Sequence, residues 1–327
     1  MAGVVPSGGT AAGPESEITR DVHGLRQWLD RKAWRDFIIA IPYVWLIFFF
    51  LLPFFIVIVI SLGVSTIAQP PVEFDTAWPY ISWENYQLIL SDPTYINGYI
   101  NSLIFASIAT FFCLVIGYPM ALAIARAEGW QRNLMLLLVI LPFWTSFLLR
   151  IYAWIGLLSN NSWFNNLVTW GYNHTIGAGA PVESLQMMNT NGAVILGIVY
   201  SYLPFMILPL YATLEKLDRT LDEAAMDLGS RPMEVFRDIT LPLSIPGIVA
   251  GGMLVFIPAT GELVIPSLMG RADSPMIGRV INDEFGLNRD WPVASAIAVA
   301  LLILLVVPIM IYNNFQSRAD AAAEAGR

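Results

Sequence analysis

Long apolar segments separated by short polar ones dominate the pattern of the chain. Six of these segments approach or exceed the about 20 residues that a helix needs to cross a bilayer. The pattern predicts membrane spans at 37–64, 100–125, 133–158, 192–214, 247–269 and 293–315. The first segment is too long for the core of a secretory signal and has no small-residue cleavage site after it, so we expect it to remain in the membrane. The predicted fold class is all-α, a polytopic membrane protein with six transmembrane helices.

Both ends of the chain are polar. Residues 1–19 are rich in Gly, Ala, Pro and Ser, which predicts a disordered tail. Residues 20–36 combine basic side chains with Trp and Leu, as in a helix that lies on a membrane surface. The predicted organisation is a tail with an interfacial helix at 1–36, a first transmembrane helix at 37–64, a membrane domain at 97–315 and a second tail at 316–327.

Charge is scarce and unevenly distributed. The chain is 56% hydrophobic and 13% charged, whereas about a quarter of the residues of a soluble domain are charged. If both termini lie inside, the inner segments hold thirteen Lys and Arg and the outer ones three, each with acidic neighbours. The positive-inside rule therefore places both termini in the cytoplasm. A net charge of −8 makes a basic groove for nucleic acid improbable.

The two long outer loops, 65–99 and 159–191, contain five acidic residues and no Lys or Arg. An acidic mouth would raise the local concentration of a cation. The same charges also suit ordinary solvated loops, and both interpretations stay open.

Several kinds of chemistry are excluded by residue type. Cys113 is the single cysteine and His23 and His174 are the two histidines, so a disulfide, a cysteine cluster and a multi-histidine metal site are ruled out. Lys32 and Lys216 are followed by Ala and Leu, so no Walker A loop is present. No HExxH or GxSxG motif occurs. We therefore predict no catalytic residue, no bound metal and no cofactor in this chain.

The inner loop 215–243 is too polar to cross a membrane but is strongly patterned. Acidic residues alternate with Ala and Leu at helical spacing up to Gly229, which is placed to end the helix in a left-handed turn. Pro232 suits the first turn of a second helix, which we expect Pro242 and Pro246 to stop. The pattern predicts two short helices joined by a sharp turn.

This loop resembles the EAA motif of ABC importer permeases. The matching positions are Glu223, Ala224, Ala225, Gly229, Ile239, Leu241 and Pro242. The resemblance implies the type I (MetI-like) permease fold and a loop that couples the permease to its ATPase, through Glu223, Ala224, Ala225, Gly229, Leu241 and Pro242. The alternative is an ordinary capped helical hairpin.

Three further segments, 141–154, 255–270 and 276–296, resemble those of polyamine permeases, most closely the putrescine type, and the likeness covers roughly residues 36–315. The resemblance implies a subunit of the bacterial inner membrane that imports putrescine or a related polyamine. It further implies three partners: an ATPase pair that holds ATP and Mg, a second homologous permease and a periplasmic polyamine-binding protein. Spermidine, another organic cation or an oxyanion remain alternative substrates. A secondary transporter acting alone would leave the EAA loop without a role and would predict inverted repeats, which the sequence does not show.

Glu262 is the one acidic residue in a predicted span. It lies between Pro258 and Pro266, where a broken helix would expose carbonyl groups that favour cations. We expect it either to line the substrate path and pair with an ammonium group, or to form a structural pair with Arg150 or with the partner permease.

Arg150 would repel a polyamine, so we expect it to fix its helix through a carboxylate or carbonyl groups. Aromatic faces can bind an ammonium group, although most such rings in membrane proteins serve as anchors or packing. The aromatic candidates are Trp144, Tyr152, Trp154, Tyr200 and Tyr202. Among these, Tyr152, Trp154 and Tyr202 join Glu262 as predicted path residues. Asp290 and Trp291 belong either to a docking surface for the binding protein or to a plain loop.

Overall fold

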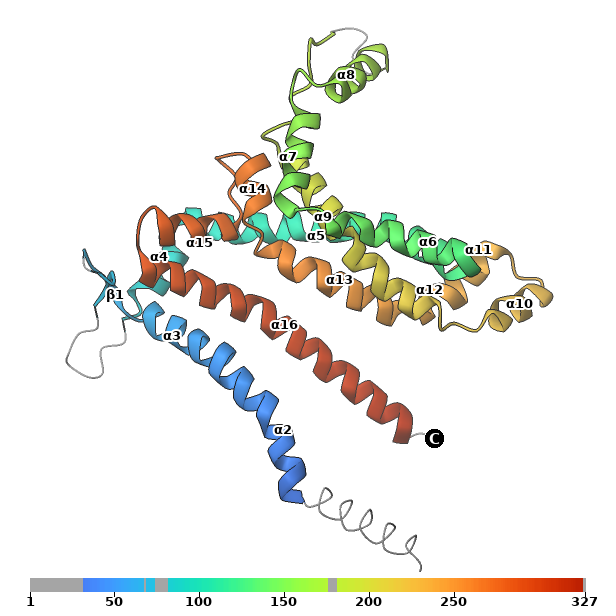
Figure 1. Cartoon of the computed structure of the whole chain (residues 1–327), viewed down its shortest axis with the longest axis horizontal. Helices are drawn as coiled ribbons and strands as arrows, with labels where there is room; N and C mark the ends of the chain where they lie inside the picture. Colours follow the sequence, from blue (N-terminus) through green and yellow to red (C-terminus); the bar gives the residue numbers. More distant parts are fainter. Residues whose placement is uncertain (1–31, 68, 74–81, 176–180, 326–327) are drawn as a thin grey trace, which may run out of the picture. The chain divides into compact units, whose positions relative to one another are not determined.

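The structure is a computed structural model that describes residues 32–67, 69–73, 82–175 and 181–325. The chain divides into two compact units, Met1–Val59 and Ile60–Arg327, and each is considered separately. The predicted disordered tail at 1–19 and most of the predicted surface helix lie outside the described residues. The described part is almost entirely helical (Figure 1), with one short antiparallel pair, β1 (Val64–Ser65) with β2 (Val72–Glu73).

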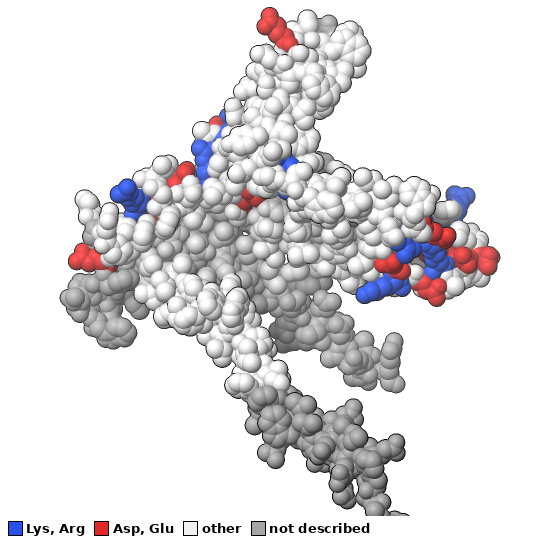
Figure 2. Space-filling model, viewed as in Figure 1, with Lys and Arg blue, Asp and Glu red and all other residues white. Residues whose placement is uncertain are grey.

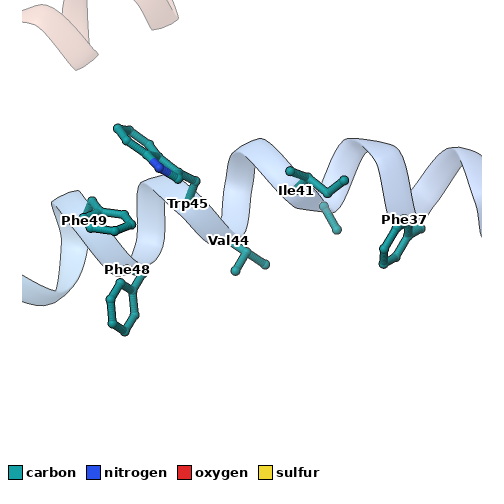
Figure 3. A pocket seen from close by; sticks show the side chains of 7 residues that line it. Phe37, Ile41, Val44, Trp45, Phe48 and Phe49 are labelled. Carbon is teal, nitrogen blue, oxygen red and sulfur yellow. The ribbon is translucent and has the colours of Figure 1, made fainter.

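The first unit contains one apolar helix. It comprises α2 (Lys32–Leu46), a π-helical turn at Ile47–Leu51 and most of α3 (Leu52–Ser61). Figure 3 shows Trp45 on one side of this helix and Val44 and Phe48 on another, beside a shallow apolar depression. Within its most apolar window only 6% of the residues are buried. A helix that is apolar on all sides and still exposed has the surface of a membrane span. It ends at Ser61, three residues before the predicted end.

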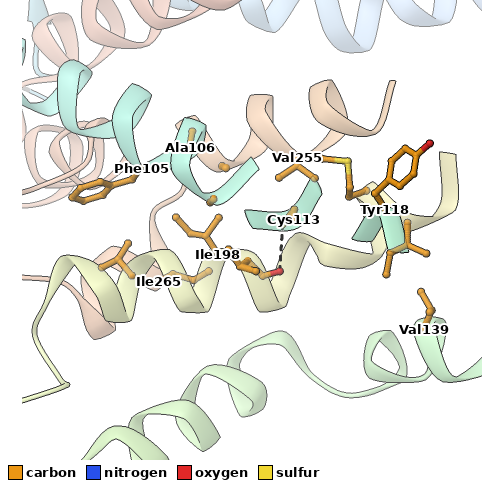
Figure 4. Close-up of a cluster of buried hydrophobic side chains, with 14 of the residues drawn as sticks. Phe105, Ala106, Cys113, Tyr118, Val139, Ile198, Val255 and Ile265 are labelled. Atoms are coloured by element: carbon orange, nitrogen blue, oxygen red, sulfur yellow. Dashed lines mark hydrogen bonds between the residues drawn. The ribbon is translucent and has the colours of Figure 1, made fainter. Parts of the chain in front are cut away.

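The core of the second unit is formed by α5 (Pro93–Arg126), α9 (Asn191–Leu214) and α13 (Ile245–Thr260). Figure 4 shows side chains from these helices in one buried cluster, with the Cys113 thiol donating to the carbonyl of Val199 at 3.6 Å. Small residues allow close approach. A Cβ atom added to Gly251 would come within 2.9 Å of the Met206 sulfur. Membrane helices commonly use such small residues where two backbones meet.

The third predicted span, 133–158, is not one rod. It consists of α6 (Gly129–Ile140), a 3₁₀ turn at Leu141–Trp144 and α7 (Phe147–Leu158), and the two arms meet at 91°. Thr145 and Ser146 adopt extended ψ angles of 152° and 135°, which end the first arm. The apolar pattern is continuous across this corner, so hydropathy predicted the segment but not its change of direction.

The fifth predicted span, 247–269, is also divided. α13 ends at Thr260, and α14 (Val264–Met269) begins after a break at 261–263. The sixth span belongs to α16 (Trp291–Ala325), so the predicted tail at 316–327 is helical through Ala325. Among the described residues, three helices are long and apolar enough to cross a membrane. Two bent pairs, Gly129–Trp144 with Phe147–Leu158 and Pro232–Leu243 with Ile245–Thr260, bring the total to at most five if each pair is one span. The apolar stretch Trp291–Val307 of α16 is compatible with a sixth crossing.

A smaller core lies at one end of the second unit. Here α4 (Glu84–Ser91) and α15 (Ile277–Gly286) pack with the beginnings of α5 and α16 around buried side chains such as Ile277 and Ile297. Tyr99 donates to the carbonyl of Ile297 at 2.7 Å, and the hydroxyl of Ser102 accepts from the backbone of Ile277 at 2.8 Å. The first bond joins α5 to α16, and the second holds α15 against α5, close to the break between α13 and α14.

Candidate functional site

The loop 215–243 contains the two predicted helices and the predicted turn. The first helix is α10 (Arg219–Asp227); Asp218 caps it by accepting from the backbone of Thr220 at 3.0 Å, a bond that lowers the pKa of Asp218 below its usual value. Gly229 has φ = +93°, and Ser230 N–H donates to Ala225 C=O at 3.1 Å. This is the glycine-closed helix end that the sequence predicted.

The second helix is made of three short helical segments. It begins with α11 (Pro232–Val235), passes through a π-helical turn at Phe236–Thr240 and ends with α12 (Leu241–Leu243). The carboxylate of Glu234 accepts from the backbone of Arg231 at 2.7 Å, which stabilises its beginning. The helix ends at Leu243, between Pro242 and Pro246 and before the fifth predicted span. Pro242 occupies the first turn of a new helical segment, where a missing N–H is tolerated, and the chain bends by 64° only at Ser244.

Ionic contacts join this loop to the end of α5. Asp222 accepts from Arg126 at 3.3 Å and from the hydroxyl of Thr240 at 3.3 Å, so one carboxylate links α5, α10 and the second helix. Arg219 donates to the carbonyls of Ala125 and Arg126, each at 3.2 Å, which satisfies the end of α5. Figure 2 shows charged side chains gathered at this end of the second unit. The contacts with α5 could not be predicted from the sequence, because their partners are more than 90 residues apart.

The predicted coupling residues lie on an accessible surface. Glu223, Ala224, Gly229 and Pro242 are exposed, and Ala225 and Leu241 are half-buried. Large apolar side chains are exposed beside them on the same two helices: Leu221, Met226, Leu228 and Met233. Leu228 and Met233 are 89% and 74% exposed. An accessible apolar patch rimmed by charge has the chemistry of a protein-docking surface.

The bend at Ser244 is held by α5. Ser244 is fully buried, and its hydroxyl donates to the carbonyl of Leu241 at 2.8 Å. The hydroxyl of Tyr118 therefore donates to Ser244 Oγ, also at 2.8 Å. The ring of Tyr118 packs edge-on against Phe236, with centroids 5.6 Å apart. Residues 126 positions apart in sequence thus fix the angle at which the loop enters α13.

Glu262 lies at the break between α13 and α14 and is 8% exposed. Tyr202 of α9 donates to Oε2 at 2.5 Å, and the backbone N–H groups of Val264 and Ile265 donate to Oε1 at 3.0 and 3.4 Å. A carboxylate has about four lone-pair positions. Three donors leave one position for a further donor, such as an ammonium group.

The break does not offer all of its carbonyl groups to a ligand. A Cβ atom added to Gly278 of α15 would come within 2.4 Å of the carbonyl oxygen of Gly261 and 2.7 Å of that of Glu262. These two carbonyls therefore lie against the α15 backbone. The predicted break is present, but at these two residues the expected exposure of carbonyls to a cation is wrong, because a glycine contact covers them.

Arg150 is buried on α7, at 8% exposure, without the expected carboxylate. In the described part of the chain, Nε and Nη1 have no hydrogen-bond partner, and no ion pair joins Arg150 to Glu262. The guanidinium instead lies near the rings of Phe143 and Phe147, at 5.6 and 5.7 Å from their centroids. The alternative prediction of an Arg150–Glu262 pair is therefore wrong for this structure.

The predicted aromatic candidates separate into two places. Tyr202 contacts Glu262, whereas Trp154 packs edge-on against Tyr200 with centroids 5.4 Å apart. Two residues turn a helix by about 200°, so Tyr200 and Tyr202 leave α9 on opposite sides. Tyr152 and Trp144 are 59% and 74% exposed. The structure thus brings together Glu262 and Tyr202, and does not join Tyr152 or Trp154 to them.

No metal centre is found in the described residues, since no three His, Cys, Asp or Glu side chains there gather in a way that could hold an ion. The remaining chemistry is that of two separate features: an exposed loop with an apolar patch, and one buried carboxylate held by a tyrosine beside a break in a membrane helix.

Comparisons with known proteins agree with these features. Residues 114–321 match the family described as binding-protein-dependent transport system inner membrane component. The chain is 41% identical over 274 residues to the spermidine/putrescine transport system permease protein PotB of Haemophilus influenzae, a match that covers 84% of this chain and 91% of that protein. It is 39% identical over 268 residues to PotB of Escherichia coli K12, covering 82% and 92%.

A solved bacterial ABC transporter involved in the import of the acidic polysaccharide alginate contains a chain of similar fold. Its TM-score is 0.65 at 17% identity, with 90% of this chain and 99% of that chain covered. At this identity the likeness concerns the fold alone, and it confirms the predicted permease fold. The related proteins are permeases of transport systems, in agreement with the prediction of a transport subunit and not an enzyme.

Proposed function

The chain belongs to the family of binding-protein-dependent transport system inner-membrane components, and on this premise we propose that it is the permease subunit of an ATP-driven importer of putrescine, spermidine or a related polyamine. The observation that carries the substrate class is about 40% identity, over more than four fifths of the chain, to permeases named for spermidine and putrescine. Putrescine is the specific substrate that we propose, on the resemblance of segments 141–154, 255–270 and 276–296.

The loop 215–243 is proposed to dock on a separate ATPase subunit, which binds ATP and Mg. Support comes from the exposed apolar side chains around Glu223 and from the rigid turn at Gly229. The ties from Asp222 and Arg219 to α5 give this surface a firm base. A loop that was merely a hairpin would need neither the exposed Leu228 nor the exposed Met233.

The substrate path is proposed to pass Glu262. A polyamine brings two or more ammonium groups into a region of low dielectric, where an unpaired charge is expensive. Glu262 offers a negative charge with room for one more donor, and Tyr202 holds it in place. Tyr152 and Trp154 stay predictions, since the structure joins neither to Glu262.

Both termini are proposed to lie in the cytoplasm, on the balance of thirteen inner to three outer basic residues. A second homologous permease and a periplasmic polyamine-binding protein complete the proposed importer, with the acidic loops 65–99 and 159–191 facing that protein's side.

The proposal is tested by reconstituting the chain in liposomes with its ATPase, second permease and binding protein, and by following radiolabelled putrescine and spermidine. We expect uptake that needs ATP and every subunit, and no uptake or ATP hydrolysis by this chain alone. Competition between the two amines then decides which is preferred. Concentrative uptake by the chain without an ATPase would instead establish a secondary transporter. ATP-dependent uptake of a different solute, with no polyamine transported, would leave the permease role intact and refute the substrate.

A further inference from the structure

The helix α8 (Trp163–Thr175) has its polar side turned inward. Asn165 and Thr169 are buried, and they bond to each other at 3.0 Å. Asn165 donates to the carbonyl of Leu185 at 2.8 Å, and Thr169 accepts from the backbone of Leu185 at 3.1 Å. One turn farther along, Asn173 exchanges two hydrogen bonds with Val182, at 2.9 and 3.0 Å.

This polar stripe fixes the rotation of α8 about its own axis. Asn165, Thr169 and Asn173 recur every four residues and are bonded to the returning segment 182–185, so turning the helix would leave buried polar groups without partners. The hydrogen bonds of the polar side therefore hold the opposite side of α8 outward.

The outward side is mainly apolar and aromatic, with the exposed Asn166 as its polar member. Trp163, Leu167 and Trp170 follow one another at spacings of four and three, which places them on one face, and they are 69%, 56% and 61% exposed. His174 extends the stripe by one turn, its ring 4.5 Å from that of Trp170. The helix has no Asp, Glu, Lys or Arg.

The path of the chain places α8 near a membrane boundary. α6 has 12 residues and the 3₁₀ turn after it has 4. At about 1.5 Å and 2.0 Å per residue they span about 26 Å, close to the about 30 Å of a hydrocarbon core. The following corner bends the chain by 91°. If α6 crosses the bilayer along its normal, α7 lies nearly parallel to the membrane plane. Four residues separate α7 from α8, so α8 stays near that level. Figure 1 shows α7 and α8 projecting sideways from α5, α9 and α13.

The exposed surface of α7 is continuous in chemistry with that of α8. Leu148, Leu149 and Tyr152 are 48%, 64% and 59% exposed. Trp144, at the corner itself, is 74% exposed. Tryptophan is enriched where a membrane meets water, because its ring is apolar and its N–H needs a polar partner.

We propose that α8 is an interfacial anchor: its Trp163–Leu167–Trp170 face lies in the headgroup region of the bilayer and binds lipid. An uncharged aromatic stripe suits the boundary between the headgroups and the acyl chains. The anchor keeps the projecting α7–α8 arm, and with it the corner that precedes Arg150, at a fixed depth. The inference rests on membership of the membrane family and is independent of the substrate.

The test uses the assembled transporter in phosphatidylcholine nanodiscs, with Cys113→Ala as background so that a single introduced cysteine bears a nitroxide spin label. One label is placed at Leu167→Cys, and a matched control at the exposed, charged position Glu183→Cys on the returning segment. Collision rates with oxygen, which enters lipid, and with a water-soluble nickel chelate are measured by electron paramagnetic resonance. If Leu167→Cys does not assemble, Trp170→Cys reports on the same face.

We expect the oxygen-to-nickel ratio at position 167 to exceed that at position 183 by at least about threefold, as for a side chain below the headgroups. A ratio equal to that of the control means that the face lies in water and refutes the anchor. A label shielded from both reagents means that another subunit covers the face. Loss of oxygen access only when the binding protein is added makes it a protein-docking surface instead. Each of these three results overturns the proposal, whether or not polyamine is transported.

Discussion

Replacing Glu262 with Gln removes a charge at the helix break while leaving the shape of the side chain. Both carboxylate oxygens are acceptors in the structure, one from Tyr202 and one from the backbone of Val264 and Ile265. In the variant, the amide oxygen can keep the two backbone bonds. Its NH₂ group then faces the hydroxyl of Tyr202, which can rotate and accept instead of donate. We therefore expect Glu262→Gln to fold and to assemble.

The expected effect is on transport. Two unit charges 4 Å apart interact by about 4 kcal/mol at an effective dielectric constant of 20. This is an upper limit, because the ammonium group also loses hydration on approaching the carboxylate. A loss of at least about 1.4 kcal/mol at the barrier corresponds to tenfold slower uptake. Glu262→Asp keeps the charge and should be milder.

Tyr202→Phe is the matched control, since it removes one donor and leaves the carboxylate bound to two backbone groups. We expect its uptake to fall by less than that of Glu262→Gln. The assay is radiolabelled putrescine uptake in cells that lack other polyamine importers, normalised to the amount of assembled complex. Near-normal uptake by Glu262→Gln would refute the path role. Loss of the assembled complex would show that the carboxylate holds the structure together.

Three further predictions concern coupling and packing. Gly229→Val places a β-branched residue at φ = +93°, so uptake and substrate-stimulated ATP hydrolysis should both fall although the protein inserts. Gly229→Asn should be less affected, because Asn tolerates this region. Normal transport by the Val variant would mean that the turn does not serve coupling. Gly278→Ala should destabilise the complex by about 1–3 kcal/mol in thermal unfolding through overpacking, whereas Gly286→Ala, whose Cβ meets nothing within 4 Å, should not; equal melting temperatures would contradict the close contact. Arg126→Asp should lower stimulated ATP hydrolysis, and adding Asp222→Arg should restore part of it. The restored part should not exceed the about 1 kcal/mol that an exposed ion pair supplies. If the double variant instead loses the sum of the two single losses, the pair does not position the loop.

Local signals in the sequence were enough to predict several helices and the turn at Gly229. The span predicted at 192–214 corresponds to α9 at Asn191–Leu214. Helix caps and the length of an apolar segment depend on residues that are close together in the sequence, so both can be predicted from it. Gly229 was predicted to need a positive φ, and it has one. The prolines around Glu262 indicated a broken helix, and the break lies at 261–263.

What the sequence did not reveal depends on direction or on distant partners. An apolar run has the same hydropathy whether it is straight or bent by 91°, so the corner between α6 and α7 was missed. The tyrosine that holds Glu262 is 60 residues away, and Asp222 and Arg126 are 96 apart. Arg150 was expected to bind a carboxylate or carbonyl groups, because a buried cation ordinarily needs such partners. In the structure two phenylalanine rings adjoin it instead.

The helix α13 connects the two candidate sites directly. Its first residue follows the bend at Ser244, and its last precedes the break at Gly261. Its 16 residues make a rod of about 24 Å, closely packed at Gly247 and Gly251 against α9. Movement of the loop relative to α5 must therefore be absorbed at Ser244, where Tyr118 opposes it, or transmitted along α13 to the break. There the backbone of Gly261 rests on Gly278 and the carboxylate of Glu262 rests on Tyr202 of α9. A displacement of α13 along α9 would also strain the Tyr202–Glu262 bond, because Tyr202 belongs to α9 and Glu262 lies two residues after the end of α13. The buried carboxylate is thereby physically connected to the loop 215–243.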